Sequence, residues 1–77
     1  MKVENIVRVT GRGHIVCSHM DDEVIRIGDK VTAGDMEFTV RGIEKWQHSK
    51  AVGLLLSPND FVQEHFRIGD KIIINEL

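Results

Sequence analysis

Short runs of apolar residues, most of them β-branched or aromatic, alternate with glycine-containing turns along the chain. In residues 36–41 apolar and polar side chains alternate strictly, and the run continues to Trp46; this predicts a strand with one face in the core. Residues 51–56 are uniformly apolar and predict a strand buried on both faces. The other strand-length runs are at residues 3–9, 14–20, 24–27, 30–33 and 71–75. Together they predict six or seven short strands.

Glycine marks the turns between these runs. The pentapeptide Arg-Ile-Gly-Asp-Lys occurs twice, at residues 26–30 and 67–71. Glycine tolerates a positive φ and aspartate can bond nearby backbone N–H groups, so both copies predict the same tight corner. Two glycines around Arg12 predict a hairpin at residues 10–13. Two copies are too few for a solenoid, so we expect a repeated corner inside a single domain, residues 1–77.

One helical segment is expected, near residues 59–66. Ser57 and Pro58 ahead of Asn59 are typical of a helix N-terminus, and Gly69 leaves room for two turns at most. Many short strands and one brief helix predict an all-β fold, a small closed antiparallel β-barrel. Closure would remove the sheet edges that so short a chain can hardly shield.

Composition and net charge limit the cellular location and the class of ligand that we expect for this domain. The chain is 42% hydrophobic and 29% charged, which is typical of a folded domain. A single cysteine, Cys17, allows no internal disulfide, no leader-like segment is visible, and residues 51–56 are too short to cross a bilayer. We therefore expect a soluble, cytoplasmic protein without membrane contact. The formal net charge of −2 disfavours a general nucleic-acid binder but leaves room for a local basic patch.

Five segments, taken in order, resemble one known family. They are Thr-Gly-Arg-Gly at 10–13, Arg-Ile-Gly-Asp-Lys-Val at 26–31, Val-Arg-Gly-Ile-Glu at 40–44, Val-Gly-Leu-Leu-Leu at 52–56 and Arg-Ile-Gly-Asp at 67–70. This series is similar to the second domain of the translational GTPases, most closely that of elongation factor Tu. The resemblance implies a closed Greek-key β-barrel that helps to hold the aminoacylated 3′ end of tRNA and touches the small ribosomal subunit.

The resemblance also implies roles for particular residues. Glu4, Asn5 and Val7 fall where the family's first strand lines the aminoacyl pocket, and Glu44 and Trp46 fall where a segment contacts the terminal adenosine. No Gly-x-x-x-x-Gly-Lys-Ser/Thr phosphate loop occurs in the chain, so we expect no GTP binding. What remains is a stand-alone, non-catalytic binding module related to translation.

The residues around Trp46 support an RNA contact on their own chemistry. Arg41, Lys45 and Lys50 place cations near Trp46 and Glu44. An indole stacked on a base contributes about 1–3 kcal/mol, cations engage phosphates, and a carboxylate accepts from a ribose hydroxyl. The alternative is that Trp46 caps the barrel and the charges form a solvated face.

Arg12 is a second candidate, because a guanidinium at a hairpin tip matches paired phosphate oxygens. The alternative is a merely solvent-exposed side chain. His14, Cys17 and His19 suggest a zinc site, but strand alternation puts only Cys17 and His19 on one face, and a structural site needs four ligands. A Cys17–His19 nucleophile pair lacks a signalled orienting group and oxyanion hole. We expect no metal, no cofactor and no enzymatic activity.

Two functions stay open from the sequence. The first is an RNA-binding module that contacts a tRNA 3′ end, the ribosome or a ribonucleoprotein. The second is a protein-interaction or structural barrel that self-associates or docks on a larger partner, covering apolar surface. The candidate contact residues for the first are Arg12, Glu44, Lys45, Trp46, Glu4 and Asn5.

Overall fold

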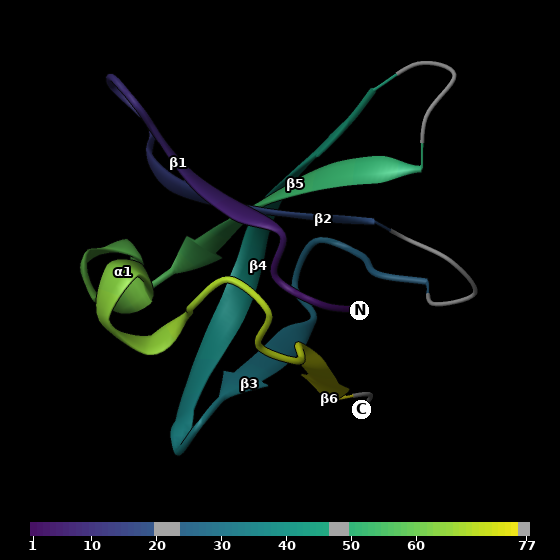
Figure 1. Cartoon of the computed structure of the whole chain (residues 1–77), viewed down its shortest axis with the longest axis vertical. Helices are drawn as coiled ribbons and strands as arrows, with labels where there is room; N and C mark the ends of the chain where they lie inside the picture. The colour runs from purple at the N-terminus through teal and green to yellow at the C-terminus, as the bar shows by residue number, and fades with distance from the viewer. Residues whose placement is uncertain (20–23, 47–49, 76–77) are drawn as a thin grey trace.

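The computed structural model describes residues 1–19, 24–46 and 50–75, and most of them form one antiparallel sheet (Figure 1). The strands within these residues are β1 (Asn5–Val9), β2 (Gly13–His19), β3 (Lys30–Ala33), β4 (Met36–Lys45), β5 (Ala51–Ser57) and β6 (Ile73–Asn75). A 3-10 turn, η1 (Asn59–Phe61), and a one-turn helix, α1 (Val62–His65), follow β5. The expected β-rich fold and the short helix near residues 59–66 are confirmed.

The strands lie in the order β1-β2-β5-β4-β3-β6, and every neighbouring pair is antiparallel. The chain therefore leaves β2 and crosses to the far side of the sheet before it forms β3. Residues 24–27, an expected strand-length run, form no strand. Only Ile25 of this run is buried, while Val24 and Ile27 are 63% and 68% exposed. The backbone N–H and carbonyl of Arg26 are both bonded to Asp29 in the corner that follows, so they are not available for a strand ladder.

The expected closed barrel is wrong, because β1 and β6 form no ladder with each other. Among the described residues, the two edges meet through the bridge between Lys2 and Lys71 and a few backbone hydrogen bonds around it. The rest of the β1 edge faces residues 63–68, which belong to the short helix and the second corner. A helical turn and a corner do not present a regular row of N–H and C=O groups, so they cannot pair with the edge of β1 as a strand would.

The two Arg-Ile-Gly-Asp-Lys copies form the same corner. In the first, the Arg26 N–H donates to Asp29 Oδ2 (2.9 Å) and the Asp29 N–H donates to the Arg26 carbonyl (3.0 Å). The corner then exchanges two backbone bonds with Val40: its N–H donates to the Asp29 carbonyl and its carbonyl accepts from the Gly28 N–H, both at 2.8 Å.

The second copy repeats all four bonds. Arg67 and Asp70 make the two internal ones, each at 3.0 Å. Val3 takes the place of Val40, donating to the Asp70 carbonyl (2.8 Å) and accepting from the Gly69 N–H (2.7 Å). Gly28 and Gly69 have φ of +98° and +95°, a backbone conformation that favours glycine. The predicted repeated corner is therefore confirmed, and each copy holds a buried valine.

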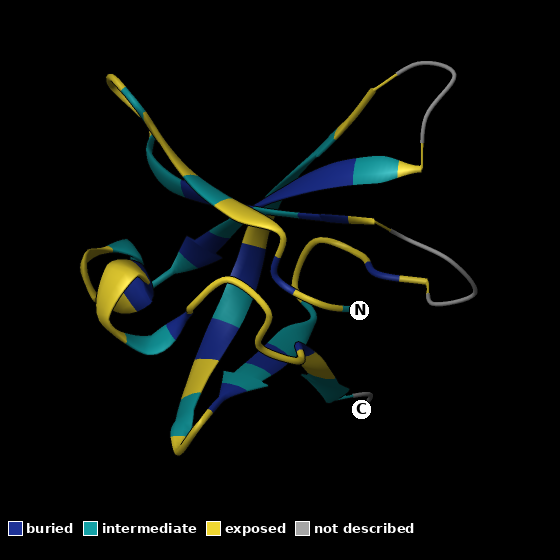
Figure 2. Cartoon of the chain, viewed as in Figure 1, coloured by how far each residue is buried: buried dark blue, intermediate teal, exposed yellow. Residues whose placement is uncertain are grey.

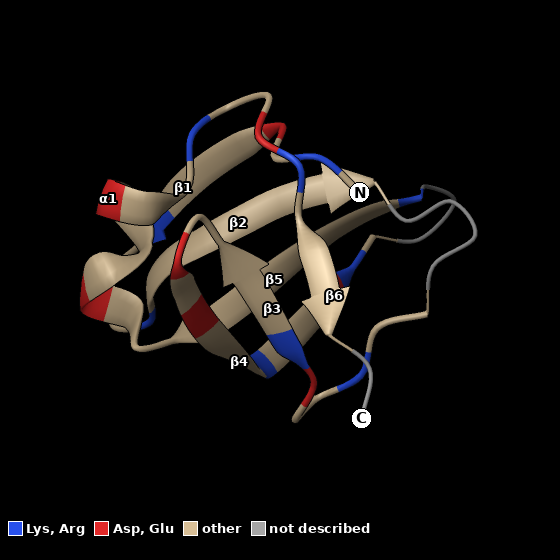
Figure 3. Ribbon diagram, turned by 90° about the horizontal axis from the view of Figure 1, so that it is seen from below, with Lys and Arg blue, Asp and Glu red and all other residues tan. Residues whose placement is uncertain are grey.

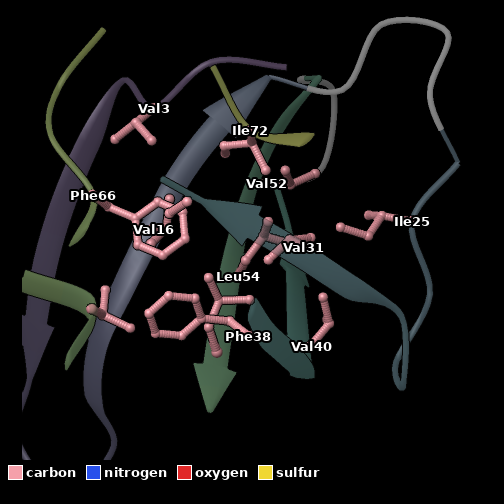
Figure 4. Packing of buried hydrophobic residues seen from close by; sticks show 13 residues of the cluster. Val3, Val16, Ile25, Val31, Phe38, Val40, Val52, Leu54, Phe66 and Ile72 are labelled. Carbon is pink, nitrogen blue, oxygen red and sulfur yellow. The ribbon is translucent and has the colours of Figure 1, made fainter. Parts of the chain in front are cut away.

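The core lies between the curled sheet and α1 (Figures 2 and 4). Phe38 and Phe66 form its aromatic centre, with ring centroids 5.0 Å apart and planes tilted by 58°. Val62 is fully buried and fixes α1 against the sheet. The core-facing residues of the central strands include Val16, Val40, Val52, Leu54 and Leu56.

Candidate functional site

A bulge in β4 brings the predicted contact residues to the outer face of the sheet. Val40 pairs with Leu56 and Gly42 pairs with Leu55, so Arg41 is an extra residue. Before the bulge the even-numbered Val40 faces the core; after it, Ile43 packs against the core instead. Glu44 consequently points away from the core, whereas uninterrupted alternation would bury it.

The outer face of β1, β2, β5 and β4 is lined by two rows of opposed residues. The rows follow from the strand register. They are Val7, Ile15, Leu55 and Gly42 in one row, and Asn5, Cys17, Gly53 and Glu44 in the other. Apolar side chains and two glycines thus lie next to a carboxylate on this outer face.

These rows contain a pocket of about 180 Å³, which we call the outer pocket. It is smaller than the roughly 300–1,000 Å³ of sites that enclose a drug-sized ligand, and suits one flat group. Its lining residues are Arg12, Ile15, Ile27, Gly42, Ile43, Glu44, Gly53 and Leu55. Sequence reasoning named Arg12 and Glu44 but missed the apolar floor, because Ile15 and Leu55 look like ordinary core residues until the register places them on the outer face.

Arg12 and Glu44 close one side of the outer pocket. Arg12 Nη1 is ion-paired with Glu44 Oε1, and both side chains are about half exposed, at 57% and 43%. An ion pair this exposed contributes about 0–1 kcal/mol. The pair can therefore open at low cost when a ligand offers either group another partner.

Trp46 lies over Gly53, a residue of the pocket floor, and is not itself among the lining residues. A Cβ at Gly53 would come within 3.2 Å of Trp46 Cη2 and 2.9 Å of Ile15 Cγ2, so the missing side chain makes room for the indole. The residue as a whole is still 47% exposed. Trp46 is thus partly covered and partly open to solvent. It lies between the two sequence-based alternatives, a buried ring that caps the fold and an exposed ring free to stack on a base.

Asn59 fixes the hairpin that carries Arg12. Its Oδ1 accepts from the His14 N–H (2.9 Å), and its Nδ2 donates to the carbonyls of His14 (2.9 Å) and Leu56 (3.1 Å). A Cβ at Gly13 would lie 2.1 Å from Asn59 Oδ1, so this close approach requires glycine. The base of the hairpin is therefore tied to η1, and the direction of its tip is set.

The other predicted residues lie away from the outer pocket. Lys45 follows Glu44 and occupies the alternate face of β4. Asn5 is three strands from Glu44 in the same row, roughly 14 Å away at ~4.8 Å per strand. Glu4 is ion-paired with His19 at the far edge. One ligand group cannot touch both Glu44 and Glu4.

Cys17 lies on the outer face between these two regions. Burial, and secondarily the negative charge of Glu4, raise the pKa of its thiol, so the thiolate form is disfavoured at neutral pH. Within residues 1–19, 24–46 and 50–75, no three His, Cys, Asp or Glu side chains come together in a way that could hold a metal ion. His14 lies on the opposite face of β2, as strand alternation predicts.

Comparison with known proteins gives no match to a family model, a curated protein or a solved structure. The resemblance to the second domain of translational GTPases therefore stays a prediction from the five sequence segments. In the part of the chain that the structure describes, none of the helices has the length and apolarity needed to cross a bilayer.

Proposed function

We propose that this chain is a non-catalytic, cytoplasmic module related to translation that binds the 3′ end of a single-stranded RNA segment, such as that of tRNA. The terminal base enters the outer pocket, Ile15 and Leu55 of the pocket floor contact one of its faces, and the open part of Trp46 stacks beside it. Glu44 accepts a hydrogen bond from a ribose hydroxyl, and Arg12 turns to the phosphate.

One observation carries this proposal: Arg12 and Glu44, far apart in the sequence, meet at the rim of an apolar pocket of about 180 Å³. An apolar slot with one carboxylate and one guanidinium at its edge suits an unpaired base attached to ribose and phosphate. The resemblance gives the same residue, Glu44, a place beside a terminal adenosine, which supports the same function from a separate line of reasoning.

The experiment is a titration of Trp46 fluorescence with a short RNA that ends in CCA. We expect a saturable change, weaker for the matching DNA because it lacks the 2′-hydroxyl. Glu44→Gln should weaken binding about tenfold, equivalent to ~1.4 kcal/mol. Asp35→Asn, which removes an exposed carboxylate from the turn between β3 and β4, is the matched control and should have no effect.

Absence of any fluorescence change at low salt, with RNA raised to millimolar concentration, would rule out this function.

A protein-interaction module is the second candidate, favoured by apolar side chains on the surface. Val24, Ile27, Ile68 and Ile73 are between 53% and 70% exposed. Self-association or docking on a larger protein would remove this surface from water. Sedimentation that shows dimers which persist after ribonuclease treatment would favour this candidate over RNA binding.

A further inference from the structure

A second groove lies along the free edge of β1, away from the outer pocket. We call it the edge groove; it encloses about 410 Å³ between β1 and residues 63–68. Its polar lining residues are Asn5, Arg8, His14, Gln63 and Arg67. Phe66 and Ile6 add an apolar floor, and none of the described residues that line it carries a carboxylate.

The edge groove contains two guanidinium groups, those of Arg8 and Arg67. Within the described part of the chain, the side chains of Arg8 and Arg67 make no ion pair and no hydrogen bond, and both residues are exposed. Elsewhere acidic and basic residues are interspersed along the strands and turns (Figure 3), and the net charge is −2. Two unpaired arginines in a groove whose lining residues carry no carboxylate favour an anionic ligand, and planar guanidinium groups match phosphate oxygens.

The edge groove is linked to the outer pocket by shared arginines. A third hollow, the tip groove, encloses about 760 Å³ beside the hairpin and η1. Arg8 lines both the edge groove and the tip groove, and Arg12 lines both the tip groove and the outer pocket. Because Asn59 ties the hairpin base to η1, the backbone of β2 next to the Arg12 tip is held at this end of the path.

Resting on the proposed function, we propose that the RNA strand whose terminal base fills the outer pocket continues over Arg12 and Arg8 into the edge groove. Its backbone phosphates pair there with Arg8 and Arg67, and the imidazole of His14 offers a further hydrogen bond. Arg12 serves this path as well, because its exposed ion pair with Glu44 opens when the ribose hydroxyl binds that carboxylate, and a guanidinium has five N–H donors. The three hollows together form one binding track for a phosphodiester backbone.

The test compares two RNAs with the same 3′ end, a dinucleotide and a hexanucleotide, each labelled at the 5′ end and followed by fluorescence anisotropy. Arg8→Ala and Arg67→Ala should each weaken hexanucleotide binding roughly fivefold and reduce the slope of log K against log salt by about 0.7. Neither should alter dinucleotide binding. Arg8→Lys keeps the charge and should show a smaller loss.

Arg26→Ala is the charge-matched control, because Arg26 is exposed and lines none of the three hollows. If both RNAs bind in a manner that depends on Glu44 and the Arg8 and Arg67 variants match Arg26→Ala, the track is overturned and the proposed function stands. If neither RNA binds, both fall. Displacement of the hexanucleotide by poly-glutamate at equal charge concentration would overturn the track in favour of an acidic protein ligand.

Discussion

At the scale of single residues, one missing side chain shapes the outer pocket. Gly53 is buried although it lies on the outer face, because Ile15 and Trp46 meet above it. Gly42, on the neighbouring strand, has more room: a Cβ there would lie 3.5 Å from Leu55 Cβ, an ordinary contact. The two glycines lie on the same face of the sheet, but only at Gly53 is the absence of a side chain needed to make room for a neighbouring residue.

Gly53→Ala is expected to displace the indole of Trp46, since the added Cβ would lie 3.2 Å from the ring and 2.9 Å from Ile15. The free energy of unfolding should fall by about 1–3 kcal/mol. The emission maximum of Trp46 should move to longer wavelength. Urea unfolding and emission spectra measure both effects, with Gly42→Ala as the control. Identical spectra for the two variants would contradict the packing of Trp46 on Gly53.

At the scale of elements, the repeated corner is the most regular device in the fold. Each copy uses a glycine with positive φ, an aspartate that accepts from the backbone two residues before that glycine, and two bonds to a valine on another segment. The two identical pentapeptides therefore form the same set of hydrogen bonds.

Gly28→Ala and Gly69→Ala should be equally harmful. Nothing lies within 4 Å of an added Cβ at either position, so the whole cost comes from the backbone conformation, about 1–3 kcal/mol. Asparagine, which tolerates positive φ better than alanine does, should restore part of the loss at both positions. Urea denaturation of the four variants checks this. A loss in one corner and none in the other would mean that the copies are not equivalent.

Local chemistry explains which elements could be predicted from the sequence. The hairpin around Arg12, both corners and the helix start at Pro58 depend on residues close together in the chain. The bulge at Arg41 was harder to predict, because its only trace in the local sequence is a spacing of three residues between two core positions, Val40 and Ile43. The apolar floor of the outer pocket has no trace in the local sequence, because it depends on the register between β2 and β5.

At the scale of the whole molecule, the two ends of the chain complete the fold. Val3 is 1% exposed and bonded to the second corner, the Ile72 N–H donates to the Met1 carbonyl (2.8 Å), and Ser18 Oγ donates to the Lys2 carbonyl. The edges of the sheet are joined here without a strand ladder. We predicted a closed barrel because a short chain must protect the edges of its sheet. In the structure, the second corner protects part of these edges in place of a strand.

Val3→Ala should therefore destabilise far more than a change at the next valine along the chain. We expect a loss of about 2 kcal/mol for Val3→Ala, from the lost apolar contact and the cavity left behind. Val7→Ala should cost less than about 1 kcal/mol, because Val7 is 40% exposed. Thermal unfolding of the two variants measures the difference. Equal costs would show that the ends of the chain contribute little to the core.

The second corner also has a consequence for the order of folding. Its partner, Val3, lies 66 residues before Gly69 and 67 residues before Asp70 along the chain. Val3 can therefore make its two backbone bonds to this corner only after a loop of more than 60 residues has closed. Closing so long a loop has a high entropic cost, so we expect this junction to be among the last contacts to form.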